Sequence, residues 1–416
     1  MTKPIAPPPR KNPQKVQPVP VLPPATRSRA AMGLTAAAAE GRFMLQHCAA
    51  CGAVQYPPRD ACNDCLCTEL TWQDTDPRGD LIAETTVRTS PNLYFRRQAP
   101  WRTGTIRLKA GPSVFAHVHG DCVKGQPVRL IARLDRAGQG VLMAVPEKAT
   151  PDMADDPELR ELGADPKHRR CLITDGRQDN APALARALID AGATMVMVGE
   201  AETWRPYPQR AALEAIPGVQ IVPLDVTDTS SVAELAGEIG GKVDILVNNA
   251  RFIRPGGILA RGDTAFARDE MEVNCLGLMR LAQAFGPGMR ARGADGTNNA
   301  VAWVNILAAH ALVNDPAYGS FNASQAAALS VCQSLRAELR PGGVRVMTLF
   351  CGPTEDDWHQ DVPPPKVTPS ALARSLVAGL RDGLEDVWCG DVARELAERW
   401  RQNPRVLERE LAGDGQ

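Results

Sequence analysis

The sequence predicts a multidomain protein in which two small β-rich units precede a larger α/β unit with a doubly wound parallel sheet. Three observations support this fold class: four cysteines in paired C-x-x-C turns, five short β-rich segments after them, and alternating strand-like and helix-like segments from residue 167 onward. A chain of 416 residues with 44% hydrophobic content is long enough for two or three domains with their own cores.

The first 40 residues are expected to form a disordered, proline-rich tail. Prolines recur through this stretch and deny it the hydrogen bonds of helices and sheets. Over the whole chain the formal net charge is −1, so no general attraction to nucleic acid or membranes is expected. Neither a signal-peptide pattern nor a run of about 18 apolar residues is present. These features favour a cytoplasmic location.

Four cysteines within residues 41–75 have the spacing of a structural metal site. Cys48 and Cys51 form one C-x-x-C turn, and Cys62 and Cys65 form a second. Each turn aims two thiolates at one ion, and two turns close a tetrahedral site that leaves no position for water. We therefore predict a zinc ribbon with one structural zinc ion. Two nearby donors lie outside the paired turns and are less favoured as ligands: Cys67 and His47.

Residues 76–150 carry five short β-rich segments without a helical period. Turn signals such as Gly-Pro and Gly-Asp separate these segments, which we place at 81–87, 104–108, 113–118, 127–132 and 140–144. Five short strands in this arrangement predict a small Greek-key barrel of the OB-fold type. Residues 151–166 are expected to be a linker.

The stretch from Gln46 to Cys65 resembles the zinc-ribbon and OB-fold family that is associated with thiolases and acyl-CoA aldolases. It reads QHCAACGAVQYPPRDACNDC and includes a Tyr-Pro-Pro-Arg insert at 56–59. The resemblance covers roughly residues 42–148. It implies that this part of the chain stabilises a thiolase-like or aldolase partner, and in some family members the domain also shapes a channel for an acyl-CoA.

An OB fold beside a zinc ribbon is also compatible with nucleic-acid binding. Aromatic residues and arginines alternate in Tyr94-Phe95-Arg96-Arg97 and in Trp101-Arg102, as they do on single-strand binding surfaces. The same run would serve a CoA phosphate or a protein interface. It would also be ordinary as a solvated loop, and the near-neutral net charge disfavours nucleic acid as a partner.

The α/β unit begins at about Lys167. Its apolar, strand-like runs lie at 170–174, 194–198, 219–224, 244–247, 301–306 and 344–349, and a helix is expected at 181–191. Several landmarks resemble the short-chain dehydrogenase/reductase family, whose domain is of the Rossmann type: Asp225-Val226-Thr227-Asp228, Asn248-Asn249-Ala250, Val273-Asn274, Ala323-Ser324 and Gly352-Pro353. We assign residues 167–395 to this domain and residues 396–416 to a C-terminal helix or tail.

The resemblance implies a glycine-rich turn, T-G-x-x-x-G-x-G, whose backbone N–H groups contact the dinucleotide pyrophosphate. Alignment on Thr174 places Asp175, Asp179 and Ala181 at the three glycine positions. Side-chain bulk and negative charge at these positions oppose a dianionic pyrophosphate. We therefore expect that NAD(P) is not bound.

Four more residues bear on cofactor binding. Gly199 and Glu200 occupy the end of the second strand, where Glu200 would repel a 2′-phosphate. Arg251 replaces the glycine that usually follows Asn-Asn-Ala, and it adds bulk where the cofactor would lie. Gly176 is displaced by one residue from the glycine pattern and does not restore it.

The same resemblance assigns four acid–base positions, namely Ser, Tyr, Lys and Asn. The segment FNASQAAAL aligns with the family pattern Y-x-A-S-K-A-A-x-L, which puts Phe321 at the Tyr position and Gln325 at the Lys position. Ala308 stands at the Ser position, and only Asn274 is retained. Phe has no proton to give, Gln has no charge and Ala has no hydroxyl. Three neighbours are less favoured as substitutes: Tyr318, His310 and Ser320.

These features favour a non-catalytic accessory or scaffold subunit of an acyl-CoA-processing complex, which links a thiolase or aldolase to an active short-chain dehydrogenase subunit. Helices expected at 266–289 and 322–339 are candidate assembly surfaces. An apolar stripe at 391–411, with Val392, Leu396 and Trp400, favours core packing over a partner site. Two alternatives are an NAD(P)-dependent oxidoreductase with a non-standard cofactor loop and a nucleic-acid-binding OB-fold protein.

Overall fold

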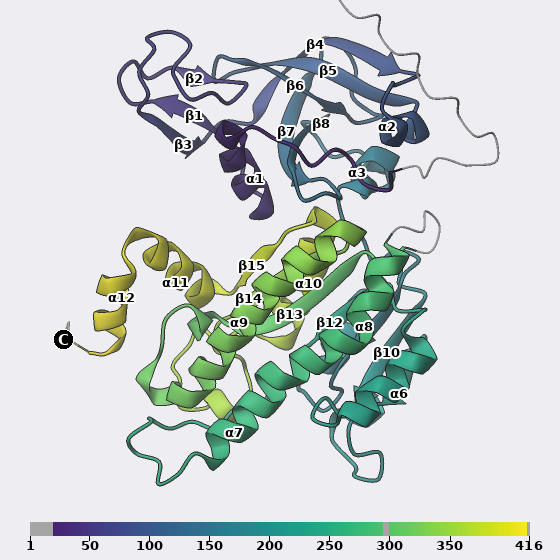
Figure 1. Cartoon of the computed structure of the whole chain (residues 1–416), viewed down its shortest axis with the longest axis vertical. Coiled ribbons are helices and arrows are strands. Elements are labelled where there is room, and N and C mark those ends of the chain that lie inside the picture. The colour runs from purple at the N-terminus through teal and green to yellow at the C-terminus, as the bar shows by residue number, and fades with distance from the viewer. Residues whose placement is uncertain (1–19, 294–298, 414–416) are drawn as a thin grey trace, which may run out of the picture.

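The computed structural model describes residues 20–293 and 299–413. A β-rich unit forms one end of the molecule and an α/β unit forms the other (Figure 1). Residues 1–19 of the predicted tail lie outside the described part. Among the helices that are described, none combines the length and apolar character needed to cross a lipid bilayer.

The end of the predicted tail is helical, which corrects the expectation of disorder up to residue 40. A 3₁₀ turn, η1 (Arg29–Ala31), leads into helix α1 (Met32–Ala39). The α1 sequence lacks proline and is rich in alanine, which favours a helix. Its Leu34 and Ala38 are buried in the core of the neighbouring barrel. Local helix propensity and packing against the barrel core thus both favour the helix in this segment.

Two small β structures form the N-terminal unit. The zinc ribbon is an antiparallel sheet in the order β2–β1–β3, formed by β1 (Met44–Cys48), β2 (Val54–Gln55) and β3 (Leu70–Asp74). All five strands predicted for the second structure are present, and they close into a barrel in the order β4–β5–β6–β8–β7. Their bounds are β4 (Arg78–Val87), β5 (Trp101–Leu108), β6 (Ser113–Val118), β7 (Pro127–Leu134) and β8 (Gly140–Pro146).

Short helices accompany the barrel. Helix α2 (Leu93–Gln98) lies between β4 and β5 and is capped by the Asn92 side chain. The expected linker at 151–166 contains a 3₁₀ turn, η2 (Met153–Asp155), and helix α3 (Pro157–Glu161). Leu162 is buried with barrel residues, so this connection packs against the barrel.

The α/β unit contains a parallel sheet in the order β11–β10–β9–β12–β13–β14–β15. Six strands were predicted: β9 (Arg170–Ile173), β10 (Met195–Glu200), β11 (Val219–Pro223), β12 (Ile245–Asn248), β13 (Ala302–Ala308) and β14 (Arg345–Cys351). The seventh, β15 (Asp386–Cys389), was missed because four residues are too few to display a period. Strand order reverses between β9 and β12, where ligands bind in such sheets.

Helices cover both faces of this sheet. One face carries α4 (Ala181–Asp190), α5 (Gln209–Glu214) and α10 (Pro369–Asp382), and the other carries α6 (Thr229–Ile239), α8 (Leu278–Arg292) and α9 (Gly319–Leu339). Helix α7 (Ala265–Met271) continues through a π-helical turn, η3 (Glu272–Gly277), into α8. Short 3₁₀ turns are η4 (Ala309–Ala311), η5 (Pro316–Tyr318), η6 (Arg340–Gly342) and η7 (Asp357–His359).

The chain ends in two further helices, α11 (Asp391–Gln402) and α12 (Pro404–Leu411). Leu396 and Leu407 are buried in a small cluster with Ala309 and Val313 of the α/β unit. Trp400 is partly exposed, with 38% of its surface accessible. The apolar stripe expected at 391–411 therefore serves mainly as core, although Trp400 lies outside it.

The barrel packs on the amino-terminal edge of the parallel sheet. Arg345, the first residue of β14, donates hydrogen bonds to the carbonyl oxygens of Leu134 and Asp135 in the barrel, at 3.1 Å each. It also donates to the carbonyl oxygens of Glu161 and Gly163. Burial lowers the pKa of Arg345 to about 10. The carboxyl edge of the sheet, where ligands bind in sheets of this kind, lies away from the barrel.

We expect Arg345→Ala to loosen this interface, because four carbonyl oxygens lose a shared donor. The Asp135 carbonyl keeps the N–H of Gly138 and the contact with Glu161 is exposed, so the loss should be about 1–3 kcal/mol, the cost of an unpaired buried polar group. Calorimetric unfolding should then separate into two transitions, one for each unit. Arg381→Ala, which removes an exposed arginine beside Asp165, is the matched control and should unfold like the unaltered protein. A single unshifted transition for Arg345→Ala would contradict this role.

Candidate functional site

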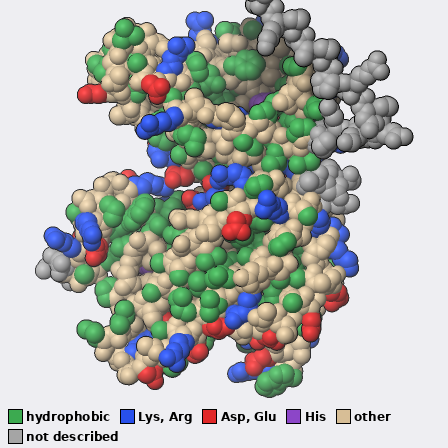
Figure 2. Space-filling model, in the orientation of Figure 1, with side chains coloured by type: hydrophobic (Ala, Val, Ile, Leu, Met, Phe, Trp, Pro, Cys, Tyr) green, Lys and Arg blue, Asp and Glu red, His purple; other side chains and the backbone are tan. Residues whose placement is uncertain are grey.

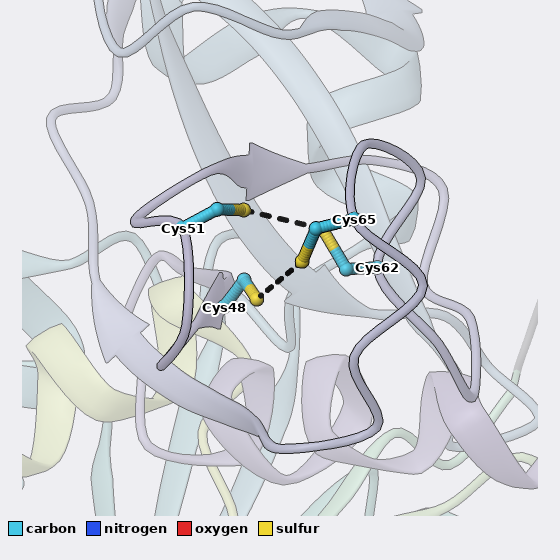
Figure 3. Close-up of side chains that lie close together, drawn as sticks. All are labelled: Cys48, Cys51, Cys62 and Cys65. Atoms are coloured by element: carbon cyan, nitrogen blue, oxygen red, sulfur yellow. Dashed lines mark hydrogen bonds between the residues drawn. The ribbon is translucent and has the colours of Figure 1, made fainter.

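The four predicted zinc ligands meet in one cluster (Figure 3). Their sulfur atoms all lie within 4.8 Å of one another, with 3.5 Å between the Sγ atoms of Cys48 and Cys65 and 3.6 Å between those of Cys51 and Cys62. A tetrahedral zinc ion with Zn–S bonds of about 2.3 Å needs sulfurs about 3.8 Å apart. The donor set and its dimensions therefore fit a structural zinc ion.

The thiols of this cluster differ in their pKa values. Backbone N–H groups of Cys51 and Ala50 lower the pKa of Cys48 to about 6, which favours the thiolate that a metal requires. Hydrogen bonds with the Cys51 and Cys48 thiols raise the pKa of Cys65 to about 12, despite the backbone N–H of Cys67. The two spare donors point elsewhere. His47 Nε2 lies 3.0 Å from the Thr75 hydroxyl, and the Cys67 sulfur accepts the backbone N–H of Glu69.

The loop at the expected pyrophosphate position, between β9 and α4, is folded around its own side chains. The Asp175 carboxylate is buried and accepts hydrogen bonds from the Arg177 backbone N–H at 3.0 Å, from Arg177 Nε at 3.1 Å and from Gln178 Nε2 at 3.0 Å. Asn249 accepts the Asp175 N–H and donates to the Asp175 carbonyl. The loop thus uses part of the hydrogen-bonding capacity that a glycine-rich turn offers to phosphate.

Electrostatic repulsion at this loop is weaker than the sequence alone suggests, because two carboxylates have cationic partners. Arg177 neutralises Asp175, and Arg210 lies 2.6 Å from Glu200, which is buried at the end of β10. The third carboxylate, Asp179, accepts from Gln209, and burial raises its pKa. Unfavourable shape is therefore the stronger obstacle to a pyrophosphate.

Both glycines of this region have packing roles. A Cβ on Gly199 would lie 2.4 Å from the carbonyl oxygen of Thr174, so Gly199 allows β9 and β10 to approach. A Cβ on Gly176 would meet Val198 at 2.9 Å and the Tyr207 hydroxyl at 3.1 Å. Gly176 therefore accommodates neighbouring side chains.

Arg251 crosses the carboxyl edge of the sheet. From the loop after β12 its guanidinium reaches the loop after β14, where it lies 2.6 Å from the Asp356 carboxylate and 3.2 Å from the Thr354 hydroxyl. Strand β13 lies between these two strands, so the ion pair passes over the end of β13. Burial opposes ionisation of Asp356, but hydrogen bonding from His359 and the charge of Arg251 hold its pKa below the usual range.

Arg251 lines two cavities that lie along the expected dinucleotide cleft. The charged cavity, of about 300 Å³, is bordered by Asp225 and Arg254. The apolar cavity, of about 330 Å³, is bordered by Ala308 and Phe321. Arg251, whose ion pair with Asp356 sequence reasoning did not find, thus lies between the charged cavity and the position of the acid–base residues. The sequence signal for this ion pair was the arginine at position 251, where a glycine usually follows Asn-Asn-Ala.

The four positions that the resemblance assigns to acid–base residues come together, and three of them hold Ala308, Phe321 and Gln325. Phe321 and Gln325 are buried in the first turns of α9, and the Gln325 side-chain oxygen accepts the Ala308 N–H at 2.9 Å. Asn274, in the π-helical turn η3, bonds to the N–H and carbonyl of Phe252 and donates to the Ser324 hydroxyl. The polar side chains at these positions therefore hydrogen-bond to neighbouring backbone and side-chain groups of the protein itself.

The three neighbours weighed as substitutes for these groups form hydrogen bonds of their own. The Tyr318 hydroxyl donates to the Trp358 carbonyl at 3.2 Å, and burial raises the pKa of Tyr318. Burial lowers the pKa of His310, which lies 3.3 Å from the Val313 carbonyl. Ser320 donates to a fully buried carboxylate, that of Glu270.

The aromatic and arginine run on the barrel is only partly available for a ligand. Tyr94 is buried, and Arg102 donates to three barrel carbonyls and pairs with Glu84. The rings of Phe95 and Trp101 pack together with their centres 5.6 Å apart. The exposed members of the run are Arg96 and Arg97. This arrangement weakens the nucleic-acid alternative.

Three family models match separate parts of the chain. The model described as enoyl-(acyl carrier protein) reductase matches residues 181–380, the ChsH2 rubredoxin-like zinc ribbon domain matches residues 35–71, and the ChsH2 C-terminal OB-fold domain matches residues 72–133. The three matches follow the order of the folded units.

Individual relatives match the C-terminal unit. The chain is 32% identical over 208 residues to an uncharacterised oxidoreductase of Mycobacterium bovis, covering 48% of this chain and 58% of that protein, so it spans little more than half of this relative. It is 34% identical over 163 residues to human 17-beta-hydroxysteroid dehydrogenase type 1, covering 38% of this chain and 47% of that protein.

One solved structure extends the comparison. A short chain dehydrogenase from Burkholderia cenocepacia, in complex with NADP, is 30% identical to this chain with a TM-score of 0.53, covering 59% of this chain and 98% of that one. Through its C-terminal unit the chain therefore belongs to the short-chain dehydrogenase/reductase family, with ChsH2-type zinc ribbon and OB-fold domains fused in front of it.

Proposed function

We propose that this chain is a non-catalytic accessory subunit of an acyl-CoA-processing complex, and that it binds no nicotinamide dinucleotide. One observation carries the proposal: the family's acid–base positions hold Ala308, Phe321 and Gln325, and the cleft leading to them is crossed by Arg251. These groups act as a unit, so losing three of four removes nearly all of a contribution of about 10²- to 10⁴-fold.

A groove between α8 and α9 supports an assembly role. It has a volume of about 900 Å³, and its walls come from α8, α9 and η6, with Met279, Gly286 and Leu335 among its lining residues. Hydrophobic side chains gather on this face (Figure 2). We propose that the groove receives the corresponding helices of a catalytically active short-chain dehydrogenase.

The two ends of the molecule suit two partners. The ribbon–barrel unit sits on the amino-terminal edge of the parallel sheet, and its resemblance to thiolase- and aldolase-associated domains makes a thiolase-like or aldolase enzyme the second partner in this proposal. An acyl-CoA shared by the two enzymes would then pass between neighbouring subunits, and no membrane or nucleic acid is involved.

Affinity purification from the native host tests this proposal. We expect the full chain to retain both an active short-chain dehydrogenase and a thiolase-like or aldolase enzyme. Ser334→Arg places a charged side chain in the α8–α9 groove and should release only the dehydrogenase. Ala337→Arg, on the exposed side of the same helix and outside the groove, is the matched control and should retain both. Recovery of neither enzyme with the unaltered chain would refute the scaffold role.

The alternative function is that of an oxidoreductase with a non-standard cofactor loop. One observation that favours it is that the 30% identical Burkholderia structure is a complex with NADP. The carboxylates at the loop are neutralised by Arg177 and Arg210, which removes part of the electrostatic objection. Dinucleotide titration separates this alternative from the accessory role.

A further inference from the structure

Two cysteines of the α/β unit lie side by side at the carboxyl edge of its sheet. Cys351 is the last residue of β14 and Cys389 is the last residue of β15, and the two are paired in register across these parallel strands. Both are buried, with 5% and 1% of their surfaces exposed, and both pack in the same core cluster as α10. Their side chains therefore project from the same face of the sheet.

The backbone spacing at this pair suits a disulfide bond. Neighbouring strands of a sheet lie about 4.8 Å apart, and disulfides join cysteines whose Cα atoms are about 4.4–6.8 Å apart. Strand β15 lies at the edge of the sheet, with β14 as its neighbour (Figure 1). A bond between the two sulfur atoms can therefore link the edge strand to the sheet with little movement of the backbone.

The two thiols differ in reactivity. The neighbouring Cys351 thiol lowers the pKa of Cys389 to about 7, against the effect of burial, and Ser375 of α10 acts in the same direction. The same interaction raises the pKa of Cys351. Burial raises the pKa of two other cysteines in this unit, Cys171 and Cys332. A thiolate is the form that peroxides oxidise, so Cys389 is the nucleophile of the pair.

A route from solvent leads to this pair. Cys351 lines the apolar cavity of about 330 Å³, and the lining of this cavity also includes the exposed residues Pro363 and Pro364. Hydrogen peroxide is little larger than a water molecule, which takes up about 30 Å³ in the liquid. The cavity therefore admits peroxide to the two thiols.

We propose that Cys351 and Cys389 form an oxidation site, which hydrogen peroxide converts to a disulfide. The Cys389 thiolate attacks one peroxide oxygen, the O–O bond breaks, and the released hydroxide takes up a proton to give water. The sulfur of Cys351 then attacks the sulfenic acid of Cys389, the S–S bond forms, and a second water leaves with the Cys351 proton. The two thiols lose two electrons, which peroxide gains. Because the reaction uses only these thiols and peroxide, the proposal is independent of the accessory role.

Peptide mapping of the full chain tests this site. The reduced protein is treated with hydrogen peroxide at a dose that converts free cysteine fully to cystine, and it is then alkylated and digested with trypsin. Tryptic peptides 346–366 and 382–394 carry Cys351 and Cys389. We expect these peptides to be linked, at a mass two hydrogen atoms below their sum, and dithiothreitol should separate them. Cys332→Ala, which removes a buried thiol from the other face of the sheet, is the matched control and should give the same link.

A second variant tests the order of the two steps. Cys351→Ala removes the thiol that resolves the sulfenic acid, so dimedone added with the denaturant should label Cys389 about tenfold or more above the unaltered chain. Equal labelling of the two proteins, with matching circular dichroism, would overturn the proposal. The peptide map of the unaltered chain decides the question even if Cys351→Ala disturbs the fold. Recovery of both peptides alkylated and unlinked after the peroxide treatment would also overturn the proposal.

Discussion

Replacing Cys62 with alanine is expected to release the zinc ion and to unfold the ribbon while the α/β unit stays folded. The ribbon has only three short strands, so the metal supplies most of its stability. Zinc binding in comparably small units contributes about 10–16 kcal/mol, far more than one buried side chain does. Elemental analysis should find about one zinc per unaltered chain and none in the variant.

The matched control for this change is Cys67→Ala. Cys67 lies two residues beyond Cys65, yet its sulfur accepts a backbone N–H and lies outside the cluster of four. The control protein should keep its zinc and its resistance to proteolysis at 41–75. A Cys62→Ala protein that stays intact under the same protease, or freshly purified native protein without zinc, would contradict the assignment.

Most of the fold could be predicted because its signals are local. Paired C-x-x-C turns identify the ribbon, and alternating patterns place all five barrel strands and six of the seven sheet strands. Helix α1 and strand β15 were not predicted, and the reason is the same for both. Each is short, and each is held by tertiary contacts: α1 by the barrel core and β15 by pairing with β14.

At the candidate site, the sequence located the positions of interest but not the contacts that their side chains make. Motif alignment identifies Ala308, Phe321 and Gln325 as substitutions, and the structure brings these positions together. Motif alignment does not reveal that Arg251 reaches Asp356, because the two residues are 105 positions apart in the chain. The expected repulsion by Glu200 was overestimated because its partner, Arg210, lies on a different element.

We also expect that restoring the acid–base residues alone will not produce an oxidoreductase. The combined variant Ala308→Ser, Phe321→Tyr and Gln325→Lys should remain inactive with NADH or NADPH, because the cleft is still crossed by Arg251 and the loop still holds Asp175. Activity should need the further changes Asp175→Gly, Asp179→Gly, Ala181→Gly and Arg251→Gly, which rebuild the phosphate-binding turn. The unaltered chain should show no turnover at all.

The prediction that the chain binds no nicotinamide dinucleotide can be tested without choosing a substrate. If the loop and the Arg251–Asp356 pair exclude the dinucleotide, the unaltered chain should give no saturable heat with NADH or NADPH at concentrations up to about 1 mM, the upper end of the range typical for enzyme substrates. Calorimetric titration of the purified full chain measures this directly. A dissociation constant of about 100 μM or tighter for either dinucleotide would contradict the account and favour an oxidoreductase with an altered cofactor loop.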